Sequence, residues 1–193
     1  SNLRKTTKTL VATTLALSTL FGVGVTSALT DTSIAHAESK ATTNTTHSKA
    51  NATSAYYNYK GYAGQDVSFV LDKHFKNAVK AENVTFNGIK LKATTSSKNV
   101  KKYDQYFRNV SKDGKTASLL DLNVTGKMTL DQLNKTYGKD LQKVNNQKHN
   151  TTGIYFYQPN SKGMTVWFDV DNGKVDRVVI GYSTVKQAMK ESK

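Results

Sequence analysis

Aromatic and basic side chains alternate with apolar ones along the last three apolar segments of the chain, at residues 154–157, 164–170 and 175–182. Successive side chains of a strand point to opposite faces, so each segment presents two faces if it is a strand. To the core face we assign Ile154, Phe156, Val166, Phe168, Val170, Val178 and Ile180. The opposite face then carries Tyr155, Tyr157, Thr165, Trp167, Asp169, Arg177 and Val179.

Aromatic rings beside a cation on an open sheet face are suited to single-stranded nucleic acid, because bases stack on rings and phosphates pair with cations. We therefore predict that Tyr155, Tyr157, Trp167 and Arg177 contact nucleic acid. The alternative interpretation is that the three rings pack against the other half of the domain. The sequence leaves both interpretations open.

A second candidate surface is a lysine-rich stretch interleaved with Tyr103, Tyr106 and Phe107. Its predicted nucleic-acid contacts are Lys98, Lys101, Lys102, Arg108, Lys112 and Lys115. Long cationic side chains on a loop and a hairpin can follow a phosphate backbone without fixed geometry. The alternative is a solvated hairpin whose lysines only discourage edge-to-edge strand pairing.

Catalytic and metal chemistry find little support in the residue types. The chain has no cysteine and four histidines, which excludes thiol nucleophiles and Cys-ligated zinc. His74 and His149 are far apart in the sequence and lack metal-ligand spacing. Phosphate-binding glycine loops and hydrolase motifs are missing from the sequence. We predict a protein that is not an enzyme and needs no cofactor.

Charge and the N-terminal pattern predict an exported polyanion binder. The formal net charge of +14 concentrates polyanions around the protein. Residues 1–37 read as a signal peptide, with basic Arg4 and Lys5, an uncharged run and a small-x-small site at Ala35 and Ala37. We expect a secreted, extracellular protein held at the cell surface by charge, with no stable membrane insertion after cleavage.

The elements that must position these side chains follow from periodicity. Residues 38–55 contain no large apolar side chain and are predicted to be a disordered linker, so the folded domain covers 56–193. Apolar spacing predicts a helix over 66–81, with Asp66 as its N-cap. Thr129 and Gln132 predict a capping box for a second helix over 129–137 that Gly138 ends. Strands are expected at 84–92, 103–110, 116–124, 154–157, 164–170 and 175–182.

The order of these elements, a helix followed by a meander of strands, occurs twice. We therefore predict an α+β fold of two helix-plus-antiparallel-meander halves, consistent with a tandem pseudo-repeat of about sixty residues. The short connections favour antiparallel pairing and leave no room for crossover helices. The tyrosine-rich segment 56–62 is expected to be an edge strand, although its rings are also able to stack on bases.

Several segments, which follow one another in the same order along the chain, resemble the immunodominant staphylococcal antigen B family. They are YYNYKGYAG at 56–64, FxLDxxFxxA at 69–78, NVTFNGIKL at 83–91, KYDQ at 102–105, YGKDL at 137–141 and WFxVD at 167–171. The resemblance implies a secreted, surface-associated antigen that binds extracellular nucleic acid with little sequence preference, with a role in immune evasion or biofilm. It supplies no site residues, so the candidate residues depend on their chemistry.

We therefore expect a secreted, non-catalytic binder of extracellular DNA or RNA. One rival is a charge-retained envelope protein that binds anionic wall polymers, for which phosphates matter and bases do not. Another is a protein-binding or inhibitor module that docks a host protein on the face of Trp167.

Overall fold

The computed structural model describes residues 40–44, 55–144 and 150–189. The predicted signal peptide and most of the predicted linker lie outside these residues. Within that linker, β1 (Lys40–Asn44) forms a strand that pairs antiparallel with β2 (Tyr56–Lys60). The segment 56–62 therefore contains the expected strand, but β1 lies beyond it at the sheet edge.

The first predicted helix is divided in two. Asp66 caps a 3-10 turn, η1 (Val67–Leu71), and its carboxylate accepts from the Ser68 N–H. Asp72 has extended backbone and caps α3 (Lys73–Lys80) by accepting from the His74 N–H. An aspartate that bonds to the backbone ahead of it competes with continuous helix, which explains the break that apolar spacing did not predict.

The second helix agrees closely with its prediction. It is α4 (Leu130–Tyr137), and the predicted Thr129–Gln132 capping box is present. Gly138 ends it with a positive φ of 53°, and a 3-10 turn, η2 (Gly138–Asp140), follows. Lys76 ties α3 to α4, because its Nζ donates to the Thr136 carbonyl at 2.8 Å and lies 5.0 Å from the Tyr137 ring centroid.

The smaller sheet, sheet A, contains parallel pairs that the prediction did not anticipate. Its order is β1, β2, β3 (Val84–Phe86), β4 (Ile89–Leu91) and β7 (Thr116–Ala117). η1 and α3 cross over between β2 and β3, which pair in parallel, as do β4 and β7. The prediction of no crossover helix was therefore wrong. The predicted Asn87-Gly88 turn joins β3 to β4, with φ of 49° and 81°.

The larger sheet, sheet B, is antiparallel and takes strands from both predicted halves. Its order is β5 (Val100–Lys102), β6 (Gln105–Arg108), β8 (Leu119–Asn123), β12 (Lys174–Gly181), β11 (Thr165–Asp171), β10 (Gly153–Tyr157) and β9 (Gln142–Lys143). The first predicted meander is thus divided, because β3, β4 and β7 lie in sheet A while β5, β6 and β8 join the second meander in sheet B, where β8 pairs with β12. The α+β class is confirmed.

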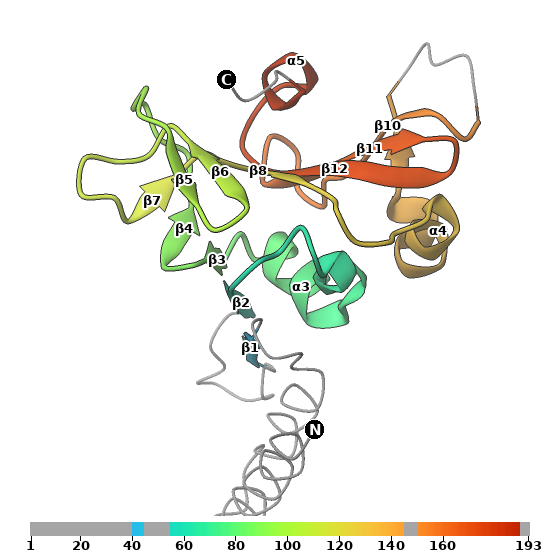
Figure 1. The fold of residues 1–193 in the computed structure, drawn as a ribbon, viewed down its shortest axis with the longest axis horizontal. Helices are drawn as coiled ribbons and strands as arrows, with labels where there is room; N and C mark the ends of the chain where they lie inside the picture. The colour runs from blue at the N-terminus through green and yellow to red at the C-terminus, as the bar shows by residue number, and fades with distance from the viewer. Residues whose placement is uncertain (1–39, 45–54, 145–149, 190–193) are drawn as a thin grey trace, which may run out of the picture.

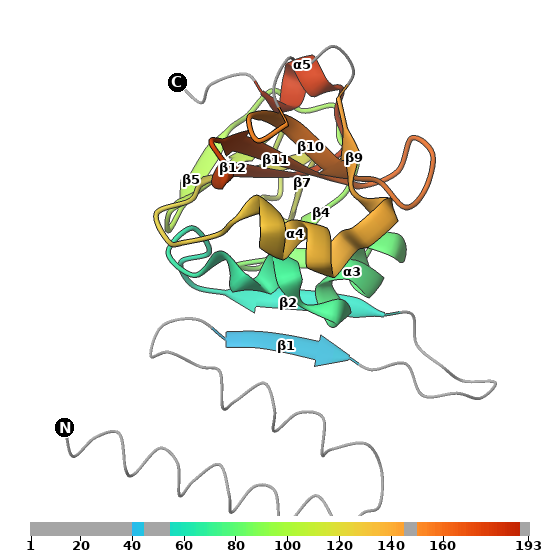
Figure 2. The same cartoon turned by 90° about the vertical axis from the view of Figure 1, so that its right-hand side faces the viewer.

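The main core lies between the two sheets and the helices η1, α3 and α4 (Figure 1). Its largest fully buried rings are Tyr57, Phe75, Phe86, Phe107 and Phe168. We call the side of sheet B toward this core the inner face. On the opposite side, the outer face, the described part of the chain places a single helix, α5 (Val185–Ala188) (Figure 2).

Candidate nucleic-acid interface

Trp167 lies on the outer face of sheet B, as strand alternation predicted, but it is covered. It is 5% exposed and packs with Leu119, Val179 and Ala188. Ala188 belongs to α5, which closes over the ring, and the Phe156 ring centroid lies 4.9 Å from that of Trp167. The prediction of an open stacking face at Trp167 is therefore wrong for this conformation.

The two faces of β10 are the reverse of the prediction. Tyr155 and Tyr157 are buried in the main core, whereas Phe156 packs beside Trp167 on the outer face. The register explains this, because Phe156 is paired with Trp167 and Tyr155 with Phe168. Tyrosine tolerates burial when its hydroxyl finds an acceptor, and Tyr155 donates to the Asn150 carbonyl at 2.6 Å. Hydrophobicity alone indicated the wrong face.

Arg108 and Arg177 are occupied by internal contacts. Both form ion pairs with the carboxylate of Asp121, at 2.6 Å for Arg177, and all three side chains are largely buried. Arg108 also donates to the Gln187 carbonyl at 2.9 Å. Arg177 donates to the carbonyls of Ala188 and Met189 at 3.2 and 3.1 Å. The two predicted phosphate ligands thus hold the carboxyl end of α5, where the last carbonyls have no partner within the helix.

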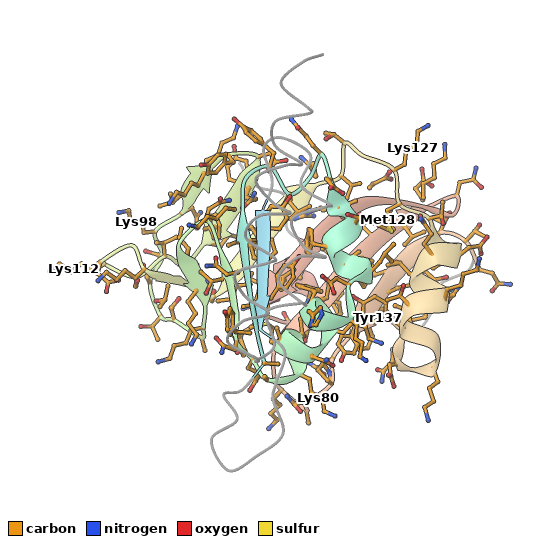
Figure 3. The ribbon with its side chains drawn as sticks, turned by 90° about the horizontal axis from the view of Figure 1, so that it is seen from below. Lys80, Lys98, Lys112, Lys127, Met128 and Tyr137 are labelled. Atoms are coloured by element: carbon orange, nitrogen blue, oxygen red, sulfur yellow. The ribbon has the colours of Figure 1, made fainter. Side chains whose placement is uncertain are left out.

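The predicted lysines remain exposed. Lys101 and Lys102 lie on β5, Lys98 lies just before it, and Lys112 and Lys115 lie in the loop between β6 and β7. We call these five residues the lysine track. The Val110 N–H donates to the Lys98 carbonyl at 2.7 Å, which brings the two loops together. Figure 3 shows Lys98 and Lys112 at one end of the molecule and Lys80 and Lys127 well away from them.

Tyr103 is the exposed aromatic ring beside this track. The predicted strand 103–110 begins later than expected, because Tyr103 and Asp104 form the turn between β5 and β6. At 49%, Tyr103 is the one exposed large hydrophobic side chain among the residues that the structure describes. Its φ is +56°, a left-handed value that is unusual for a bulky residue. Such sparsely populated backbone conformations are found most often at functional sites.

A hydrogen-bond network beneath the turn holds Tyr103 in place. The Asp104 carboxylate accepts from the backbone N–H groups of Ala63 and Gly64 at 3.1 and 2.8 Å. Lys102 Nζ donates to the Asn87 carbonyl at 2.6 Å, which ties the turn to sheet A. The Tyr62 ring meets Tyr103 edge-on at 5.0 Å between centroids. The contacts of Asp104 and Lys102 therefore hold the turn in place on both sides of Tyr103. Binding of a ligand to the exposed part of the ring then costs little conformational entropy.

Buried amides extend this network into the domain. Asn87 and Gln105 bond to each other at 2.7 Å, and both also donate to the Gly61 carbonyl. Gly64 must be glycine, because a Cβ there would lie 2.2 Å from the Asn123 carbonyl oxygen. The segment that carries Tyr62 is therefore held tightly against the hairpin.

The loop between β6 and β7 has its own local bonds. The Asp113 carboxylate accepts from the Ser111 hydroxyl at 2.6 Å and from the Lys115 N–H at 3.0 Å. The Ser111 bond, followed by the Lys115 bond, lowers the pKa of Asp113. The loop that presents Lys112 and Lys115 is therefore shaped by an ionised aspartate, which also reduces its net positive charge.

Two further properties of the described residues bear on other functions. No cluster of three or more histidine, aspartate or glutamate side chains in 40–44, 55–144 and 150–189 is arranged to hold a metal ion. None of the helices in those ranges has the length and apolar character needed to cross a membrane.

The sequence contained signals for two features that the prediction missed. Asp121 is a lone acid in an otherwise leucine-rich strand, a pattern that indicates a buried cationic partner. The turn at Tyr103 lies midway between the apolar residues Val100 and Phe107, which are paired across the hairpin in the structure. The sequence contains only a weak indication of the helix that covers Trp167, since α5 is four residues long.

The sequence was also compared with known proteins. The family profile described as immunodominant staphylococcal antigen B matches residues 56–180. Proteins of that name from Staphylococcus aureus strains USA300 and NCTC 8325 are each 42% identical over 185 residues, covering 95% of this chain and 98% of the relative. The same holds for strain N315. No solved structure matches significantly.

Proposed function

Since the chain belongs to the immunodominant staphylococcal antigen B family, we propose that it is a secreted, non-catalytic protein that binds extracellular nucleic acid with little sequence preference. The proposed contact surface is the β5–β6 hairpin with the adjoining loop. The lysine track meets phosphates, and Tyr103 stacks on a base.

One observation carries this proposal, namely the exposed Tyr103 ring held in a left-handed turn with lysines on the same hairpin. A ring of this kind contacts any base through its π-face, and lysines contact phosphates without reading sequence. The combination favours single strands, whose bases are free to stack. It also accounts for low sequence preference, because neither contact reads the hydrogen-bonding edge of a base.

Salt dependence tests the phosphate contacts. Log affinity for a single-stranded oligothymidylate should fall linearly with log salt, with a slope of about −0.7 for each phosphate contacted. The double variant Lys98→Gln/Lys112→Gln should flatten that slope by about 0.7 for each phosphate that the variant no longer neutralises. The matched control is Lys80→Gln/Lys127→Gln, which removes the same charge from exposed positions elsewhere (Figure 3).

Several results would contradict the proposal. An affinity that does not change with salt would rule out phosphate neutralisation. Equal effects of the two lysine pairs would indicate attraction by net charge rather than by this surface. Binding of an inorganic polyphosphate that matches oligothymidylate binding, with no effect of Tyr103→Ala on either, would instead favour an anionic wall polymer as the ligand.

A further inference from the structure

The outer face of sheet B carries aromatic and arginine side chains of the kind that bind nucleic acid, and the short helix α5 lies over them. Trp167 is more than nine-tenths buried, and its Nε1 atom has no hydrogen-bond partner among the described residues. A buried N–H donor without an acceptor costs free energy, and native proteins rarely keep one without a reason. The turn α5 and its C-cap residue contribute the apolar side chains Val185, Ala188 and Met189 to the cover over Trp167, and no acceptor for that N–H.

We propose that α5 is a displaceable cover over a second single-stranded nucleic-acid-binding surface, formed by Trp167 and Phe156 as stacking rings and by Arg108 and Arg177 as phosphate ligands. This inference depends on the proposed function, since it assigns a further surface to the same ligand. Displacement of α5 would extend the hairpin surface across the sheet.

The cover is weakly built. α5 is a single helical turn, and one turn does not stabilise itself in water. A capping box between Thr184 and Gln187 begins the turn, and the two arginines bond to its last carbonyls. The Tyr182 N–H donates to the Ser118 carbonyl at 2.9 Å and secures the end of β12. This bond lets the residues after Tyr182 move while β12 stays paired in sheet B.

The uncovered surface would be continuous with the hairpin. The register places Lys101, Tyr106, Asp121, Val179, Trp167 and Phe156 opposite one another in one row across six neighbouring strands. Adjacent strands are about 4.8 Å apart, so Lys101 and Trp167 are separated by about 19 Å along the row. Lys101 Nζ already lies 5.5 Å from the Tyr106 ring centroid. A strand bound at the hairpin would therefore reach the tryptophan directly.

The arginine chemistry favours an anionic ligand. Each guanidinium now donates to neutral carbonyl oxygens of α5, and a phosphate oxygen is a stronger acceptor for the same donors. Asp121 would remain between the arginines and hold both in place, with a net charge of about +1 for the three groups. The Trp167 N–H would gain access to an acceptor on the ligand or in water.

The single tryptophan of the chain reports directly on this cover. We would measure acrylamide quenching of Trp167 emission in the full chain, with and without oligothymidylate. The test variant is Thr184→Ala/Gln187→Ala, which removes the capping box of α5. Its matched control is Thr129→Ala/Gln132→Ala, which removes the same type of capping box from α4.

We expect the α5 capping variant and the α4 control variant to behave differently. Loss of a cap should raise the population of displaced α5 by about tenfold, so that quenching of Trp167 increases and the apparent oligothymidylate affinity rises by up to the same factor. The control pair should change neither quantity. In the unaltered chain, saturating oligothymidylate should quench Trp167 emission by stacking and speed hydrogen exchange in residues 184–189.

Three results would overturn the inference. If Trp167 emission and exchange at 184–189 stay constant while the hairpin lysines still control affinity, the proposed function stands and α5 is a permanent cover. Greater acrylamide quenching in the capping variant without tighter binding would show that α5 opens but that the surface beneath it does not bind nucleic acid. A shift of that variant to a dimer with Trp167 still protected would assign α5 to helix exchange between copies. Absence of oligothymidylate binding by every form would instead remove the proposed function itself.

Discussion

The β5–β6 hairpin and the outer face beneath α5 contain the same kinds of residue and use them differently. At the hairpin and its adjoining loop, the side chains of Tyr103, Lys98, Lys101, Lys112 and Lys115 are exposed. Beneath α5, Trp167 is buried and both arginines are bonded to one carboxylate and to helix carbonyls. Residue type and face are thus insufficient to define a binding surface, because an internal partner can already occupy the same groups.

The difference originates in one acidic residue and one helical turn. Asp121 neutralises part of the charge of the arginines on the outer face, and α5, together with Val144, Ile154 and Phe156, supplies apolar contacts that exclude water from Trp167. The carboxylate of Asp104 at the hairpin bonds instead to backbone N–H groups, which leaves the neighbouring lysines without an acidic partner from that residue. The hairpin therefore keeps its positive charge available for ligands.

The largest expected effect is on the outer face. Asp121→Ala would leave Arg108 and Arg177 without their shared carboxylate in a largely buried position. Loss of one partner from a buried ion pair costs about 3 to 5 kcal/mol, so the free energy of unfolding in urea should fall by that amount. A loss below about 1 kcal/mol would mean that water already solvates the arginines, and the contrast between the two regions would disappear.

The next effect concerns Tyr103. Tyr103→Ala should weaken oligothymidylate binding by about 1 to 3 kcal/mol, because one base loses its stacking partner. The free energy of unfolding should change by less than about 0.5 kcal/mol, since the ring is half exposed. Fluorescence anisotropy and urea unfolding of the same samples measure both quantities. A variant that loses stability but keeps its affinity would make the ring a structural residue.

The network below Tyr103 should have a smaller effect on the free energy of unfolding than the Asp121 ion pairs. Asp104→Ala removes the acceptor of the Ala63 and Gly64 N–H groups, which costs about 1 kcal/mol of unfolding free energy at this partly buried site. Oligothymidylate affinity should also fall, because Tyr103 is no longer held in its left-handed turn. Full affinity in this variant would show that the hairpin needs no such support.

The smallest effect is a pH dependence at the base of α5. Burial, followed by the Glu82 carboxylate, raises the pKa of Tyr182 to about 12. The unfolded chain gives up this proton near pH 10, so the folded state binds more protons between about pH 10 and pH 12 and stability falls as pH rises through that window. Tyr182→Phe should make the fall in unfolding free energy less steep. An unchanged slope would mean that Tyr182 ionises freely in the folded state.

Local sequence patterns predicted the parts of the fold that depend on local chemistry. The capping box at Thr129, the Asn87-Gly88 turn and the inner-face residues of β11 and β12 were all confirmed. The break at Asp72 was missed, because apolar spacing continues through it while the aspartate side chain bonds to the backbone. Such competition depends on a single side chain and leaves the helical period unchanged.

Contacts between distant parts of the chain determined which faces are buried, a property that the local sequence patterns did not predict. Alternation fixed which residues of β10 share a face, but only pairing with β11 placed Tyr155 in the core and Phe156 outside. The cover over Trp167 depends on a turn of four residues, too short for a periodic signal. At the candidate site, the lysine-rich stretch was evident from the sequence and its lysines are exposed, whereas the exposure of Tyr103 required knowledge of the turn and of its contact with Tyr62.

The most direct measurement of the central claim is a residue-by-residue map of the bound surface. Backbone amide NMR shifts of the full chain should be recorded during titration with oligothymidylate. The hairpin account predicts the largest shifts at 98–103 and 112–115, with little change at Lys80 and Lys127 on other parts of the surface. Shifts confined to the surface of α4, or spread evenly over all exposed lysines, would contradict it.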